Sequence, residues 1–151
     1  MAYLADTNVA ARWVLSGDPN YPTIRRAVFE LQTRQEIIYV TTQVLVAFHA
    51  LATRPVIANG LGWTPRAARA EARNIEAMFP LLPETEAVYP SWGALIDAYD
   101  IVGRQVYDAQ IVAVMHAYRI SHLLTMNPGH FRRFDGVTVV EPHTLITTPS
   151  V

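Results

Sequence analysis

The sequence predicts an α/β fold with a central, mostly parallel sheet of four or five strands flanked by helices. Short apolar runs alternate along the chain with longer stretches of helical spacing. Capping and turn residues separate the two kinds of segment. Hydrophobic residues make up 51% of the 151 residues and charged residues 17%, which is typical of a globular chain and argues against a disordered one.

Each predicted element rests on a local pattern. Apolar runs predict strands over 3–5, 37–40, 122–125 and 137–140, with 81–82 as a short strand or a loop. Helices are predicted over 9–15, 21–35, 42–53, 64–78, 90–102 and 107–118. Thr41 and Thr42 offer an N-cap to the third of these helices, and Pro65 suits the first turn of the fourth. No linker or repeat divides the chain, so we expect a single domain over 1–151.

Composition excludes several classes of chemistry. The chain has no cysteine, which excludes disulfides, thiolate metal sites and a cysteine nucleophile. All 12 basic residues are arginine, so a catalytic lysine is excluded as well. The net charge is −1, so any contact with RNA must use local patches and not a long-range field.

We expect a cytoplasmic protein. No apolar run reaches the roughly 18 residues that a membrane span needs. The start of the chain has no basic region and meets Asp6 early, so it does not have the pattern of a signal peptide. The lack of cysteine fits a reducing compartment.

Three polar residues stand where a parallel sheet would gather them. Asp6 and Asn127 each follow a predicted strand, and Asp108 lies near a helix start. Converging carboxylates suit a hard cation such as Mg²⁺ or Mn²⁺. Each residue also has a simpler interpretation, because Asp6 and Asp108 could each cap a helix and Asn127 belongs to an Asn-Pro-Gly turn.

Four segments carry a resemblance when they are taken together and in order. They are Leu4-Ala5-Asp6-Thr7-Asn8, Thr42-Gln43-Val44-Leu45 with Thr53-Arg54-Pro55, the run from Tyr107 to Ala113, and the run from Leu123 to Phe131. This pattern resembles that of PIN domains, in particular the toxin nucleases of VapC-type toxin–antitoxin pairs. The resemblance implies a PIN-like three-layer fold and a metal-dependent endoribonuclease.

The resemblance also implies roles for individual residues. Asp6 and Asp108 match the family's metal-binding carboxylates, and Asn127 matches a residue that supports the site. These three are therefore the expected catalytic residues, with Mg²⁺ as the cofactor and Mn²⁺ as an alternative. Asn8 and Thr125 match polar positions that orient the carboxylates.

Two positions depart from the family pattern. An acidic residue is expected at position 47, where this chain has Ala47, and an Asp often stands at position 130, where it has His130. Two carboxylates of the usual four-acid pocket are missing, which implies a weakened site. A deliberate inactivating substitution, a naturally degenerate domain and compensation by a neighbouring residue all remain open as explanations.

Helical spacing indicates which way position 47 faces. One stripe of the helix over 42–53, assigned to the cleft, holds Gln43, Ala47, Ala50 and Arg54. The side expected to face the core holds Val44, Leu45, Phe48 and Leu51. Ala47 therefore stands where a cleft-facing carboxylate would be expected.

The expected partners are an RNA substrate, a cognate antitoxin and a second copy of the chain. The resemblance implies the antitoxin and the homodimer. Val9, Trp13 and Val14 offer apolar surface at helical spacing for an antitoxin helix. Arg132 and Arg133 either hold RNA phosphates or form an ordinary solvated pair. The alternative function is a catalytically inactive PIN domain that binds a protein or RNA.

Overall fold

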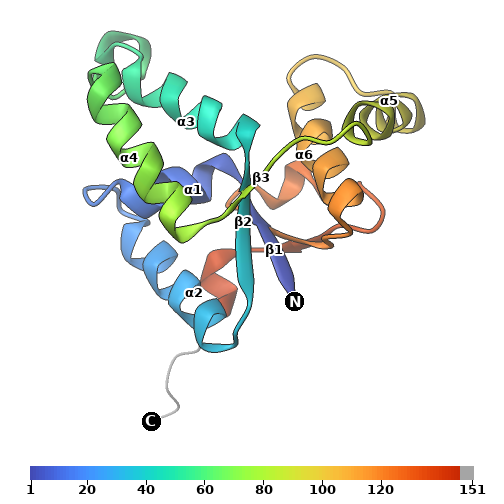
Figure 1. Ribbon diagram of the computed structural model, residues 1–151, viewed down its shortest axis with the longest axis horizontal. Helices are drawn as coiled ribbons and strands as arrows, with labels where there is room; N and C mark the ends of the chain where they lie inside the picture. Colours follow the sequence, from blue (N-terminus) through green and yellow to red (C-terminus); the bar gives the residue numbers. More distant parts are fainter. Residues whose placement is uncertain (147–151) are drawn as a thin grey trace.

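The protein folds around a five-stranded parallel sheet with the strand order β3-β2-β1-β4-β5. The computed structural model describes residues 1–146 (Figure 1). The strands are β1 (Ala2–Ala5), β2 (Ile37–Thr41), β3 (Leu81–Leu82), β4 (His122–Leu124) and β5 (Thr138–Val140). Every neighbouring pair is parallel. The predicted α/β class is confirmed, and the short run at 81–82 is a strand.

Within residues 1–146, six α-helices connect the strands. They are α1 (Thr7–Val14), α2 (Tyr21–Thr33), α3 (Thr42–Thr53), α4 (Pro65–Met78), α5 (Val88–Tyr99) and α6 (Gln105–Tyr118). Short 3₁₀ turns lie at Val56–Ala58, Pro128–His130 and Pro142–Leu145. None of the helices within residues 1–146 is long and apolar enough to cross a membrane.

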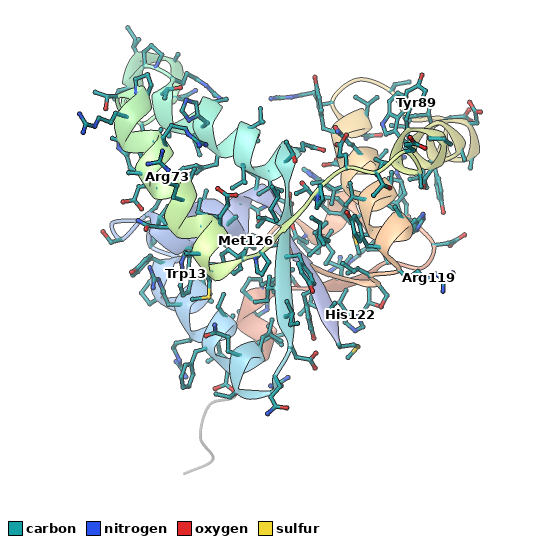
Figure 2. All side chains as sticks on the ribbon, in the orientation of Figure 1. Trp13, Arg73, Tyr89, Arg119, His122 and Met126 are labelled. Carbon is teal, nitrogen blue, oxygen red and sulfur yellow. The ribbon has the colours of Figure 1, made fainter. Side chains whose placement is uncertain are left out.

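The sheet separates two hydrophobic cores, which gives the predicted three layers. Tyr3 and Ala5 of β1 face a core built with α1, α2, α3 and α4. Leu4, which lies between them, faces the second core, built mainly with α5 and α6. This alternation follows from the pleat of the strand. Figure 2 shows the separation, with Trp13 on one side of the sheet and Tyr89 on the other.

Three helices begin earlier than the sequence predicts. Helix α1 starts at Thr7 because the Asp6 carboxylate accepts a hydrogen bond from its backbone N–H (2.8 Å). Helix α5 starts at Val88, since Pro90 fits the first turn, where backbone N–H groups have no partner within the helix. Helix α6 starts at Gln105, just after the turn that Gly103 makes with a φ of 60°.

The first helix does not offer the apolar docking surface that its spacing suggested. Val9 is fully buried and Trp13 is 9% exposed. Trp13 packs edge-on against Phe79 at 5.6 Å between ring centroids, and the Arg25 guanidinium lies over the Trp13 ring at 3.6 Å from its centroid. Val14 packs against the same core. The apolar stripe of α1 is thus used inside the fold.

Candidate active site

A pocket of about 480 Å³ opens beyond the carboxyl ends of the central strands. We call it the strand-end pocket, and Asp6, Asn8, Asp108, Asn127 and His130 are among the residues that line it. Asp6 follows β1, Asn127 follows β4, and Asp108 lies in the first turn of α6. The structure therefore brings together the three residues that the sequence singled out, as the parallel sheet predicts.

Asp6 both caps a helix and presents a carboxylate. Its Oδ1 accepts a hydrogen bond from the Thr7 N–H, which is the simpler role foreseen for it. Its Oδ2 accepts hydrogen bonds from the Thr125 hydroxyl (2.8 Å) and from the Asn8 side-chain amide (3.2 Å). The side chain is held from several directions, so its orientation is set by the protein.

Thr125 and Asn8 tie the end of β4 to the end of β1. The hydroxyl of Thr125, which is fully buried, donates to Asp6 and accepts from the Asn127 N–H (3.0 Å). The Asn8 side-chain oxygen accepts from the Met126 N–H (3.1 Å). Because these bonds span both strands, they fix the positions of Asp6 and Asn127 relative to each other.

Asp108 enters the pocket from the opposite layer. Helix α6 has Arg104 at its cap position, so Asp108 lies inside the first turn and is not the N-cap. Its Oδ2 lies 3.9 Å from Nδ1 of His130. The family often has an Asp at position 130. In this chain His130 stands there instead, and its imidazole lies close to the Asp108 carboxylate.

Both carboxyl groups have raised pKa values. Burial is the main cause for Asp6, and hydrogen bonds from Thr125 and Thr7 oppose the rise in its pKa. Burial is also the main cause for Asp108; His130 and Arg133 lower its pKa, while the negative charge of Asp6 raises it. The surroundings of the two carboxylates therefore only partly compensate their negative charges. A bound cation would stabilise these charges.

The donor set fits a cation bound jointly by protein and substrate. Within residues 1–146 there is no group of three or more His, Asp or Glu side chains able to hold a metal ion by themselves. Mg²⁺, however, commonly binds through one or two carboxylates and completes its shell with water and substrate phosphate. Asp6 and Asp108 supply two carboxylates in one pocket. They fit Mg²⁺ in this mode and do not form a closed cage.

Ala47 lies on the side of α3 that faces this pocket. Gln43, one turn before it, donates a hydrogen bond to the Tyr107 carbonyl at the start of α6 (3.1 Å). Leu51, one turn after it, lines the strand-end pocket. Because residues four apart share a helix face, Ala47 lies between these two contacts. The side chain brings no oxygen to that face.

The assignment of Ala50 on α3 is wrong, and its neighbour Leu51 faces a pocket as well as the core. Leu51 packs against the core, as expected, but it is only half-buried and also lines the strand-end pocket. Ala50 was expected at the cleft, but it lines a groove between α3 and α4. The stripe facing the cleft is rotated by one position, because Val44, Phe48 and Ala52 are the buried residues of this helix.

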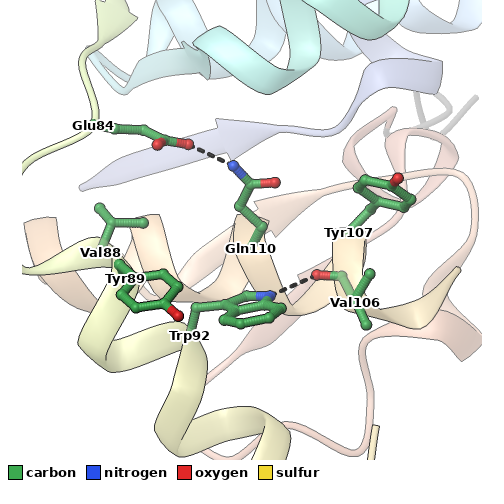
Figure 3. A pocket seen from close by; sticks show the side chains of 7 residues that line it. All are labelled: Glu84, Val88, Tyr89, Trp92, Val106, Tyr107 and Gln110. Carbon is green, nitrogen blue, oxygen red and sulfur yellow. Dashed lines mark hydrogen bonds between the residues drawn. The ribbon is translucent and has the colours of Figure 1, made fainter. Parts of the chain in front are cut away.

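A second pocket lies on the other side of α6 and has a different character (Figure 3). We call it the aromatic pocket, and it is lined by Glu84, Val88, Tyr89, Trp92, Val106, Tyr107 and Gln110. Its polar groups bond to one another, since Gln110 donates to Glu84 (2.6 Å) and the Trp92 indole N–H donates to the Val106 carbonyl (2.9 Å). Tyr107 and Gln110 belong to one of the motif segments, but the sequence assigned no site role to any residue of this pocket.

Residues 3–137 match the PIN domain family. The chain belongs to the PIN-domain family. The resemblance stated from the sequence motifs is therefore confirmed. Among curated proteins, none matches the chain.

Solved structures of VapC toxins and their complexes share the fold of this PIN domain. VapBC2 from Rickettsia felis bound to a promoter DNA fragment is similar with a TM-score of 0.69 and 15% identity, over 93% of this chain and 98% of that one. DNA-bound VapBC from Salmonella typhimurium gives 0.69 and 17%, over 94% and 98%. Mycobacterium tuberculosis VapC20, a sarcin–ricin loop cleaving toxin, gives 0.57 and 21%, over 80% and 86%. These TM-scores show a common PIN-like fold at low sequence identity.

Proposed function

We propose that this PIN domain is a Mg²⁺-dependent endoribonuclease, the toxin of a toxin–antitoxin pair, with a site weakened at position 47. Nuclease activity is a property of the family to which residues 3–137 belong. The observation that carries the proposal is the pair of carboxylates, Asp6 and Asp108, that line one pocket with raised pKa values. A divalent cation would supply the positive charge that these two carboxylates need in their ionised forms.

The residues present would divide the work of phosphodiester hydrolysis. Bound Mg²⁺ would polarise the phosphate and lower the pKa of a bound water. Asp6 and Asp108 would hold the ion, and the hydrogen bonds from Thr7 and Thr125 would keep the Asp6 carboxylate in its binding orientation. Asn127, placed by its backbone bond to Thr125, would support the same pocket.

Position 47 is where the site lacks a group. A carboxylate on that face of α3 would orient the attacking water or accept its proton. It would also add a third negative charge beside Asp6 and Asp108, and Mg²⁺ affinity rises with the number of anionic oxygens. We therefore expect the chain as it stands to be a poor ribonuclease that depends on substrate phosphate to complete the metal shell.

The decisive experiment compares Ala47→Glu with Ala50→Glu. We expect Ala47→Glu to raise Mg²⁺-dependent cleavage of single-stranded RNA at least about tenfold and to lower the Mg²⁺ concentration for half-maximal rate. Ala50→Glu adds the same charge three residues away, in the groove between α3 and α4, and should change neither quantity. Thermal melts of both variants show whether each stays folded.

The result that would contradict the proposal is equally specific. An Ala47→Glu protein that melts like the parent, binds Mg²⁺ no more tightly and cleaves no faster would favour the second candidate function. That candidate is a catalytically inactive PIN domain that binds a protein or RNA, and the missing acid at position 47 is the observation in its favour.

The proposed partners are a second copy of the chain and an antitoxin with an apolar helix. Solved relatives of the same fold include a toxin–antitoxin complex from Klebsiella pneumoniae. The groove between α3 and α4 is mainly apolar and is lined by Leu45, Val46 and Leu81. Val46 is 63% exposed, and Ile57 beyond the end of α3 is 97% exposed. We place the antitoxin helix on this groove, in place of the buried stripe of α1.

Two measurements test the partners separately. A monomeric mass by light scattering at micromolar concentrations would rule out the homodimer. For the antitoxin, Val46→Asp should weaken co-purification with the co-expressed cognate protein, whereas Thr33→Asp, an exposed change on α2, should not. Equal effects of the two substitutions would contradict the placement of the antitoxin helix.

A further inference from the structure

We infer that a pocket formed by Arg104 and Arg133 is a phosphate subsite, which holds the backbone phosphate next to the one that is cleaved. This pocket has a volume of about 350 Å³ and is lined by Arg104, Gln105, Asp108, Gly129, His130 and Arg133. We call it the arginine pocket. The inference rests on the proposed nuclease function and adds to it the path of the RNA strand.

The arginine pocket adjoins the strand-end pocket directly. Asp108 and His130 line both of them. The two pockets therefore open on either side of the same carboxylate, which would hold the metal. A polyanion with one phosphate at Asp6 and Asp108 would have its neighbouring phosphate within reach of the arginine pocket.

Arg133 is held in position by neighbouring side chains. Its Nη2 donates a hydrogen bond to Oε1 of Gln105 (2.8 Å). Its guanidinium carbon lies 5.3 Å from the ring centroid of Phe134, which is 2% exposed. Its positive charge also lowers the pKa of Asp108, which places it within electrostatic range of the site. The hydrogen bond uses one N–H of a group that has five, so others can bind an anion.

In the described part of the chain, the two arginines of the arginine pocket form no ion pair. Within residues 1–146, neither Arg104 nor Arg133 has a carboxylate partner within 4.0 Å. Arg132, by contrast, lies 4.0 Å from Glu141 and does not line the pocket. The sequence offers no reason to assign different roles to Arg132 and Arg133. The structure places Arg133 in the pocket and Arg132 near Glu141.

A phosphate is the anion that this arrangement suits. Guanidinium groups match phosphate oxygens in shape and charge, and Arg104 and Arg133 approach from different segments. The first turn of α6, which carries Gln105 and Asp108, adds the positive end of its dipole. Since the whole chain has a net charge of −1, an RNA strand needs local contacts of this kind to bind.

The experiment measures RNA binding apart from cleavage. A fluorescently labelled single-stranded RNA is titrated with Arg104→Gln, Arg133→Gln and the double variant in buffer without divalent metal, and fluorescence anisotropy is followed. We expect binding about threefold weaker for each single change and about tenfold weaker for both. The slope of log Kd against log salt should become shallower by about 0.7 for each arginine removed.

Cleavage kinetics distinguish binding from a general structural effect. In the Ala47→Glu background, the same substitutions should raise KM by similar factors and leave kcat within about twofold. Arg133→Lys should recover most of the lost affinity, because a lysine keeps the charge although it loses the planar fork. A merely structural role for Arg133 would not give this split or this rescue.

Arg132→Gln is the matched control. It removes the same charge from the neighbouring residue, and that residue is exposed and faces Glu141. We expect Arg132→Gln to leave both RNA affinity and the salt slope unchanged. If it weakens binding as much as Arg133→Gln, the effect is general electrostatic attraction and the subsite is wrong.

The remaining outcomes distinguish a failure of the phosphate subsite from a failure of the proposed nuclease function. RNA that binds equally well to the parent chain and to the double variant, while Ala47→Glu still cleaves, would overturn the subsite and leave the proposed function intact. RNA that neither the parent nor Ala47→Glu binds would overturn both. Inorganic phosphate that competes as effectively as RNA, at equal phosphate concentration, would show an isolated anion site and would contradict the strand path.

Discussion

Helix α6 contributes to two pockets of opposite character. On one side, Asp108 enters the strand-end pocket, where burial and the charge of Asp6 raise its pKa. On the other side, Val106 and Gln110 enter the aromatic pocket, where Gln110 is hydrogen-bonded to Glu84 and the Val106 carbonyl to the Trp92 indole (Figure 3). A pocket whose polar groups satisfy one another stabilises the fold. A pocket whose charges are left uncompensated is prepared for a ligand.

The largest expected effect is on the rate of RNA cleavage, which should depend on the strand-end pocket and not on the aromatic pocket. In the Ala47→Glu background, Asp108→Asn should lower the rate of RNA cleavage about 100-fold or more, because it removes one of the two native carboxylates proposed to bind the metal. Glu84→Gln makes the equivalent change in the aromatic pocket and should alter the rate less than about twofold. Initial rates at saturating Mg²⁺ measure both. If Glu84→Gln costs as much, the aromatic pocket is part of the active site.

The next effect concerns the residue that orients Asp6. Thr125→Val leaves Oδ2 of Asp6 and the Asn127 N–H without the hydroxyl that they share. We expect the free energy of unfolding to fall by about 2 kcal/mol and cleavage by Ala47→Glu to fall about tenfold.

Urea unfolding and initial rates check the Thr125→Val prediction. Thr53→Val is the control, since the Thr53 hydroxyl donates to the His49 carbonyl within α3 (2.8 Å) and serves no carboxylate. Cleavage that is unaffected by Thr125→Val would mean that the orientation of Asp6 does not depend on this hydroxyl.

A change in the aromatic pocket should affect stability alone. Trp92→Ala removes the stacking on Tyr89 within α5, the packing against the second core and the indole bond to Val106 of α6, so we expect a loss of about 2 kcal/mol in the free energy of unfolding. Trp92→Phe keeps the ring and should lose about half as much. RNA cleavage per folded molecule should not change, as measured well below the melting temperature. A selective loss of cleavage would break the distinction between the two pockets.

The smallest expected effect is a dependence on pH. The pKa of Asp108 is raised in the folded state, so its contribution favours folding below the ordinary Asp pKa and is lost as the pH rises through the folded value. Asp108→Asn imitates the neutral form. At pH 7 it should therefore raise the melting temperature by about 1–2 °C, and the gain should disappear toward pH 3. A melting temperature that falls at pH 7 would contradict the assigned direction.

The strand ends were predictable from the sequence because they follow from simple rules. Buried runs next to Asp6 and Asn127 indicate parallel strands, and parallel strands end at one edge. Asp108 stood near a predicted helix start, and the motif resemblance added its role; its helix packs in the second core, on the other face of the sheet from α1. The match to the PIN family confirms that resemblance, while the catalytic roles stay predictions.

Other features depend on tertiary packing and were missed. An apolar stripe such as Val9 and Trp13 shows that a helix face is covered, but it does not show whether the core or a partner covers it. The faces of Ala50 and Leu51 differ by one position of helix rotation, which spacing alone does not fix. Arg132 and Arg133 differ because Arg133 bonds to Gln105, 28 positions away in the sequence, whereas Arg132 lies near Glu141. Local sequence does not reveal either partner.

The hydrogen bond between Thr125 and Asp6 joins residues 119 positions apart. Strand β1 is made first during synthesis, yet its pairing with β4 must wait until residues 122–124 exist. Contacts of such high sequence separation form late and slow the folding of a chain. The carboxylate at the end of β1 therefore gains its final orientation only after β4 and Thr125 have been translated. A nascent chain that ends before β4 would hold Asp6 without the hydrogen bonds that orient it.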